Sequence, residues 1–64
     1  KEIGILLKAL NDNSSEVKDI SAYYILQYNN IEALKKVISI KSDSENMKII
    51  IDKSLSKIKN LEKN

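Results

Sequence analysis

Residues 6–28 read LLKALNDNSSEVKDISAYYILQY, and this stretch decides the fold. Leucines at helical spacing open it, a polar run follows at residues 11–15, and helical spacing resumes beyond that run. Because turn-forming and N-capping residues separate the two apolar segments, we expect a helix on each side of a short turn. The predicted helices lie near residues 2–10 and 14–28. The second is expected to bury Val17, Ile20, Ser21, Tyr24, Ile25 and Tyr28.

The second half of the chain repeats this order and predicts helices near residues 31–41 and 45–62. The chain has no Pro and one Gly, and no segment sustains the alternation of a strand. We therefore predict an all-α fold in which the short loops make neighbouring helices antiparallel. The expected inner positions of the second half are Ile31, Leu34, Val37 and Ile38, followed by Met47, Ile50, Ile51, Ser54, Leu55, Ile58 and Leu61.

Polar residues at the predicted helix starts indicate where each helix begins. Asn30 is placed to cap the third helix. The second and fourth helices carry the spacing of a capping box, at Asn13 with Glu16 and at Ser42 with Glu45.

The two halves align as an internal repeat. Their first helices match at an offset of 31 residues and their second helices at an offset of 30. The one-residue change falls in the turn within the repeat, where insertions are tolerated. We therefore divide a single domain, 1–64, into repeat one, 2–28, and repeat two, 31–62.

Both copies resemble a HEAT-like repeat of the short kind found in phycobilisome-lyase-type arrays. That family joins a leucine-rich first helix, through a turn that contains Asp, to a second helix that begins Glu-Val-Arg/Lys. The matching residues are Leu6, Leu7, Leu10, Asp12 and Glu16-Val17-Lys18, and in the second copy Leu34, Ile38, Asp43 and Asn46-Met47-Lys48. The resemblance implies two antiparallel helix pairs stacked as a fragment of an α-solenoid.

The sequence also departs from the HEAT-like pattern. The usual turn Pro is missing, with Asn13 and Ser44 near its place, and large side chains enter the second helices at residues 20–24 and 49–51. Larger side chains there change the distance at which helices pack. A closed four-helix bundle therefore stays open as the alternative architecture.

The resemblance also implies where a partner binds, because the second helices of such arrays line a concave face. The implied partner contacts are Asp19, Tyr23, Gln27, Asp52, Lys53 and Ser56. Off the predicted inner face, we expect a stacking or self-association surface at Ala22, Tyr23 and Leu26. Repeat two has the polar outer side of a C-terminal capping repeat, so we expect the chain to be the end of a longer array or half of an oligomer.

The composition excludes several kinds of chemistry. The 64 residues include no Cys and no His, which removes disulfides, zinc sites and triad bases, and one Gly cannot form a phosphate-binding loop. Capping and the helix dipole explain the carboxylates near the first turn, and the turn residues Asp12 and Asp43 lack the spacing of an EF-hand loop. We therefore expect no catalytic residue, no metal, no cofactor and no enzyme activity.

The remaining expectations concern location and partner. No apolar run approaches a membrane span of ~20 residues and no signal peptide pattern is present, so we expect a cytoplasmic chain without a membrane partner. Residues 1–34 hold three Lys and five acidic residues (net −2), and residues 35–64 hold eight Lys and four acidic residues (net +4). Nucleic-acid binding by the Lys-rich half is the alternative function, disfavoured because the chain has no Arg. The favoured function is a protein interaction or scaffolding module whose partner is another protein, further repeats or a second copy.

Overall fold

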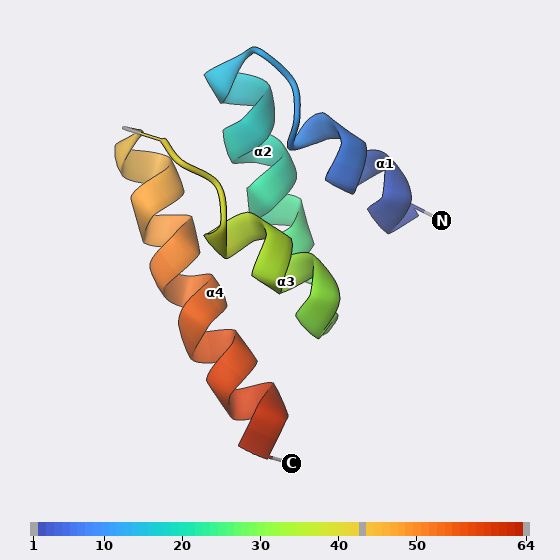
Figure 1. Ribbon diagram of the computed structural model, residues 1–64, viewed down its shortest axis with the longest axis vertical. Helices are drawn as coiled ribbons and strands as arrows, with labels where there is room; N and C mark the ends of the chain where they lie inside the picture. Colours follow the sequence, from blue (N-terminus) through green and yellow to red (C-terminus); the bar gives the residue numbers. More distant parts are fainter. Residues whose placement is uncertain (1, 43, 64) are drawn as a thin grey trace.

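The computed structural model describes residues 2–42 and 44–63, and it confirms the predicted all-α fold (Figure 1). Within these residues the chain forms four helices and no strand. The helices are α1 (Glu2–Ala9), α2 (Ser15–Leu26), α3 (Ile31–Ile38) and α4 (Glu45–Lys63). Their order is the predicted one, although α2 and α3 end a few residues earlier than expected.

The starts of α2 and α3 are fixed by side-chain caps. Asn30 Oδ1 accepts a hydrogen bond from the backbone N–H of Ala33 at 3.1 Å, which confirms the predicted cap. The prediction for α2 is wrong by one residue, because Ser14 rather than Asn13 caps it. The Ser14 Oγ accepts from the Val17 N–H at 3.4 Å, and its backbone has the extended conformation that an N-cap requires.

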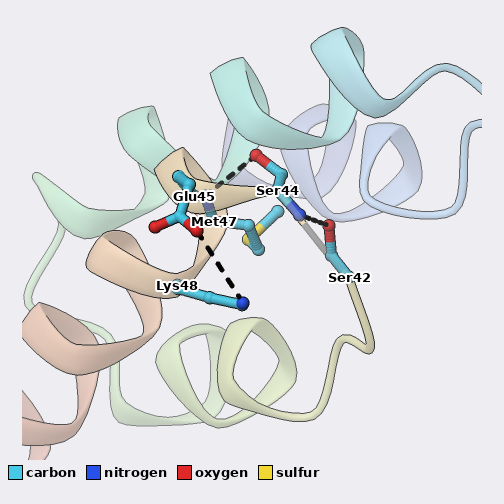
Figure 2. A network of polar contacts seen from close by, with 5 residues as sticks. All are labelled: Ser42, Ser44, Glu45, Met47 and Lys48. Carbon is cyan, nitrogen blue, oxygen red and sulfur yellow. Dashed lines mark hydrogen bonds and ion pairs between the residues drawn. The ribbon is translucent and has the colours of Figure 1, made fainter.

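The start of α4 is also capped by a later residue than predicted (Figure 2). The Ser44 Oγ accepts from the backbone N–H of Met47 at 3.2 Å, whereas the Ser42 Oγ accepts from the Ser44 N–H at 3.1 Å. Ser42 therefore orders the turn, and Ser44 takes the capping role expected of Ser42. Glu45 does not complete a capping box with Ser42; its carboxylate lies 4.0 Å from the Lys48 Nζ.

Helix α2 packs on α1, α3 and α4. Further contacts join α1 to α3 and α3 to α4, but none joins α1 to α4 in the described residues. In Figure 1, α2 and α4 run side by side in one direction while α1 and α3 run roughly the opposite way. The fold is flat, measuring 35 × 27 × 15 Å. Each predicted helix pair is therefore adjacent in space, and α2 joins the first pair to the second.

The core lies where α2, α3 and α4 meet. Its buried apolar residues are Leu10, Ala22, Ile25, Ala33, Leu34, Val37, Met47, Ile50 and Ile58. The predicted inner positions of α3 and α4 are confirmed as buried or half-buried, with the exception of Leu55, which is 41% exposed. The predicted apolar residues of α1 pack half-buried against this core.

The buried face of α2 differs from the predicted one. Its buried residues are Ser21, Ala22 and Ile25. Three residues expected in the core, Val17, Ile20 and Tyr24, are exposed instead, and Tyr24 is 52% exposed. Small side chains at 21 and 22 let the backbone of α2 come close to its neighbours, which a tyrosine or isoleucine there would prevent. The helix is therefore rotated relative to the prediction, and its large side chains face outward.

Ser54 provides a test of this packing, because its Oγ is buried and neither donates nor accepts a hydrogen bond in the structure. We expect Ser54→Ala to raise the free energy of unfolding by about 1 kcal/mol, since the substitution removes an unpaired polar group and favours helix. Urea denaturation followed by circular dichroism measures this change.

Ser21→Ala is the matched control. The Ser21 Oγ donates to the Val17 carbonyl oxygen at 2.7 Å, so its removal costs a hydrogen bond and we expect no gain in stability. An equal loss of stability in both variants would show that the Ser54 hydroxyl is paired.

Candidate functional site

An apolar groove runs between α2 and α4 on the face that α1 and α3 leave uncovered. It encloses about 490 Å³. Its apolar lining comes from both helices and consists of Ile20, Tyr23, Tyr24, Leu26, Ile49 and Ile50. The polar residues Asp19, Asn46 and Lys53 complete the lining. The groove is the candidate functional site.

The exposed apolar side chains that line this groove, together with Ile5 of α1, make up what we call the central apolar surface: Ile5, Ile20, Tyr23, Tyr24 and Ile49. Tyr24 joins its two parts, because it lines both the α2–α4 groove and a second hollow beside Ile5 between α1 and α2. The rings of Tyr23 and Tyr24 meet edge to face, with centroids 5.7 Å apart and planes at 71°. This pairing holds two aromatic rings at the surface in a fixed relation.

At the end of the groove where α4 begins, Asp19 forms a hydrogen bond with Ser44. The Ser44 Oγ donates to Asp19 Oδ2 at 2.7 Å while it also accepts from the Met47 N–H. The half-buried carboxylate therefore lies at the start of α4, where the helix dipole favours negative charge. Asp19 attaches the start of α4 to the side of α2.

The far end of α2 is attached to α4 by a lysine. The half-buried Lys57 donates from its Nζ to the carbonyl oxygen of Leu26, the last residue of α2. Two anchoring contacts, one from Asp19 and one from Lys57, thus hold α2 and α4 together along the groove. Lys57 therefore has a structural contact within the chain.

The residues predicted to bind a partner do not all lie together. Asp19, Tyr23 and Lys53 line the α2–α4 groove. Gln27 lines the hollow between α1 and α2, and its Nε2 donates to the Tyr23 carbonyl oxygen at 3.4 Å. The other two predicted contacts, Asp52 and Ser56, lie on a separate shallow hollow of α4, which Lys53 also borders.

The predicted stacking surface of Ala22, Tyr23 and Leu26 needs correction. Ala22 is fully buried in the core of this chain, so no further repeat can cover it. Leu26 is half-buried against the core, and only Tyr23 is exposed. The open side of the first helix pair is instead formed by Ile5, which the sequence pattern did not single out, and by Tyr24, which it placed in the core. The pair of small residues, Ser21 and Ala22, is the signal that could have shown which side of α2 faces inward.

The remaining polar residues show structural contacts. Asp12 Oδ1 accepts from the Ser14 N–H at 2.8 Å and so orders the turn before α2. Asp43, its predicted counterpart, lies outside the described residues. In the described part of the chain no three His, Cys, Asp or Glu side chains are grouped as metal ligands. No helix there is long and apolar enough to cross a membrane.

No protein-family model matches the sequence, and comparisons with curated proteins and with solved structures find no significant match. The site is therefore interpreted from its own geometry and chemistry.

The Asp19–Ser44 contact gives a prediction about stability. Ser44→Ala removes the cap of α4 and leaves the Asp19 carboxylate without its donor, so we expect a loss of about 2 kcal/mol in the free energy of unfolding. Asp19→Ala removes the carboxylate itself, including the unpaired Oδ1, and should cost less. Chemical denaturation of the two single variants and the double variant measures the coupling, which we expect to be about 1 kcal/mol.

Ser14→Ala is the control for the cap alone, because Ser14 caps α2 and its hydrogen bonds with Asp12 and Val17 stay within that turn. Additive losses for Asp19→Ala and Ser44→Ala would mean that the hydrogen bond between them contributes nothing to stability.

Proposed function

We propose that the chain is a non-catalytic interaction module of the HEAT-like type, which binds another helical surface, a second copy of itself included, through the central apolar surface. The exposure of Ile5, Ile20, Tyr23, Tyr24 and Ile49 on three adjoining helices is the observation that carries this proposal. Single exposed apolar residues are ordinary, but a group of this kind is typical of an interaction site. Tyrosine is also enriched among the residues that dominate binding energy.

The groove fits an amphipathic helix as its occupant. Its floor is apolar, at Leu26 and Ile50, and its rim carries Asp19, Asn46 and Lys53. This combination of an apolar centre and a polar rim is typical of protein interfaces. A helix that presents apolar side chains at i, i+3 and i+4 can lay them into such a groove, and α2 itself carries Ile20, Tyr23 and Tyr24 at that spacing.

Two observations support a stack of helix pairs over a closed bundle. A closed bundle brings its first and last helices together, but α1 and α4 make no contact in the described residues. The open side of α1 and α2 also holds an apolar hollow of about 530 Å³, beside Ile5 and Leu6. A preceding helix pair would cover this hollow in a repeat array.

The distribution of exposed apolar residues supports a capping role for the second pair. Of the large apolar residues that are exposed, only Ile49 and Leu55 belong to α3 and α4. The ion pair between Lys35 and Glu62, at 3.9 Å, adds to the polar character of the second pair. A terminal repeat needs a polar outer side, whereas a repeat inside a stack needs apolar surface on both sides.

The absence of a suitable reactive arrangement favours binding over catalysis. Asp19 and Lys53 are the titratable acid and base that line the groove with the tyrosines, and Asp19 is already engaged by Ser44. A small core also favours association, because domains below ~70–80 residues rarely gain more than ~3–5 kcal/mol on folding alone. Burying the central apolar surface in a partner adds to that margin.

Self-association tests the proposal directly. We expect sedimentation equilibrium between micromolar and millimolar concentration to show a reversible dimer or higher oligomer of the wild-type chain. Combining Tyr23→Ala with Ile49→Ala should weaken this association by about tenfold or more, because both side chains are more than half exposed at the centre of the surface. The helical circular dichroism of the variant should be unchanged.

Leu55→Ala is the matched control, since Leu55 is an exposed apolar residue of α4 that lies outside the groove. It should leave the association constant within about twofold of the wild-type value. A folded wild-type chain that stays monomeric throughout this range, or an equal effect of Leu55→Ala, contradicts the proposal.

A further inference from the structure

A second groove gathers positive charge on other elements of the fold. It lies between the C-terminal ends of α1 and α3 and the first turns of α2, and it encloses about 570 Å³. Its lining includes Lys8, Lys18, Lys36 and Lys41, and no Asp or Glu. No residue of α4 or of the central apolar surface contributes to it. We call it the lysine groove.

Within residues 2–42 and 44–63, no carboxylate forms an ion pair with a lysine of the groove. The ion pairs of the described residues join Lys35 to Glu62 and Lys48 to Glu45, so none neutralises a groove lysine. Two acidic residues directly follow residues of the lining, Asp12 after Asn11 and Asp19 after Lys18. Asp12 accepts a hydrogen bond from the Ser14 N–H, and Asp19 accepts one from the Ser44 Oγ. Four ammonium groups gathered without a carboxylate repel one another, and an anion in the groove removes that repulsion.

Helix capping accounts for only part of the cluster. Lys8 and Lys36 lie in the last turns of α1 and α3, where the helix dipole favours a cation. The terminal carbonyls there are already satisfied, because the Lys8 oxygen accepts from the Asn11 N–H at 3.1 Å and the Lys36 oxygen accepts from Ser39 Oγ at 2.7 Å.

The other two lysines have no such explanation. Lys18 lies near the start of α2, where the helix dipole disfavours a cation, and its side chain is half-buried at the groove. Lys41 belongs to the connection between α3 and α4 and to no helix. A ligand that bears negative charge accounts for both positions.

We propose that the lysine groove binds a compact oligophosphate, either free or as the phosphate chain of a nucleotide. Lysine binds phosphate as a point charge, and four lysines match an anion of about two to four negative charges. Leu7, Leu10 and Ile40 supply the apolar part of the lining, and the lysine ammonium groups supply the positive charge that binds the anion. The chain has no Arg with which to bind carboxylates bidentately, so phosphate is favoured over carboxylate as the ligand.

The shape of the cluster favours a small anion over a nucleic acid. The lining contains no aromatic side chain on which a base could stack. The lysines of α4 lie outside the groove, so positive charge does not continue from it along a path that a duplex would need. Even single DNA-binding modules bury ~600–1,000 Å² of surface, which is more than one groove of this small fold provides.

Isothermal titration calorimetry with sodium tripolyphosphate tests the proposal on the wild-type chain. We expect saturable binding with one site per chain that weakens as salt is raised. Combining Lys18→Gln with Lys41→Gln should reduce the affinity by about tenfold or more, because each loses one charge-assisted contact. Helicity by circular dichroism should remain that of the wild type, since neither ammonium group forms a hydrogen bond or ion pair with another described residue.

The matched control combines Lys59→Gln with Lys63→Gln, which removes the same charge from exposed positions of α4. It should change the affinity by no more than about twofold, as expected of distant charges screened by salt. Titration with ATP distinguishes the two sources of phosphate. If ATP binds more tightly than tripolyphosphate, the ligand of the lysine groove is a nucleotide; if the two bind equally, the ligand is a free oligophosphate.

Three results would overturn the proposal. They are equal losses of affinity in the two double variants, no saturable binding of tripolyphosphate at low salt, and binding of duplex DNA by a chain that does not bind tripolyphosphate. Because the central apolar surface shares no residue with the lysine groove, these outcomes are independent of whether the chain self-associates.

Discussion

The fold depends on how closely α2 approaches its neighbours. This helix packs on α1, α3 and α4, and it does so with Ser21, Ala22 and Ile25 on its inner face. A buried serine would be costly if its hydroxyl were unpaired, but Ser21 donates to the Val17 carbonyl oxygen of the same helix. Two of the three buried residues of α2 are therefore small, and the Ser21 hydroxyl is paired, so the helix backbones can come close at Ser21 and Ala22.

The small inner face determines what the outer face contains. Since Ser21 and Ala22 share the core side of α2 with Ile25, the large apolar residues Ile20, Tyr23 and Tyr24 are left toward solvent. An ordinary surface helix is polar on that side, because one apolar stripe is enough to attach it to the core. The apolar groove is thus a direct consequence of the packing of α2, and the anchoring contacts of Asp19 and Lys57 keep its two sides in register.

The sequence predicts the helices well and the face of α2 poorly, for a physical reason. Each face of α3 is clearly apolar or clearly polar, so its period identifies the inner side, and Asn30 stands alone before it as a cap. By contrast, residues 20–26 of α2 are all apolar or small, and a pattern weighted toward large residues selects the outer side of the helix. Several residues in the polar runs before α2 and α4 could cap these helices, and the sequence does not distinguish among them. In the structure, Ser14 is set apart by its extended backbone and Ser44 by its contact with Asp19.

The distribution of charge along the sequence was also a poor guide to the charge of the surface. Lys8 and Lys18 belong to the half with net negative charge, whereas Lys36 and Lys41 belong to the positive half. They line one groove because α1 packs on α3, which brings the C-terminal ends of both helices beside the start of α2. An oligophosphate held there contacts both helix pairs at once. Since a ligand stabilises the state that binds it, that anion stabilises the same arrangement of helix pairs that places α2 beside α4 and forms the apolar groove.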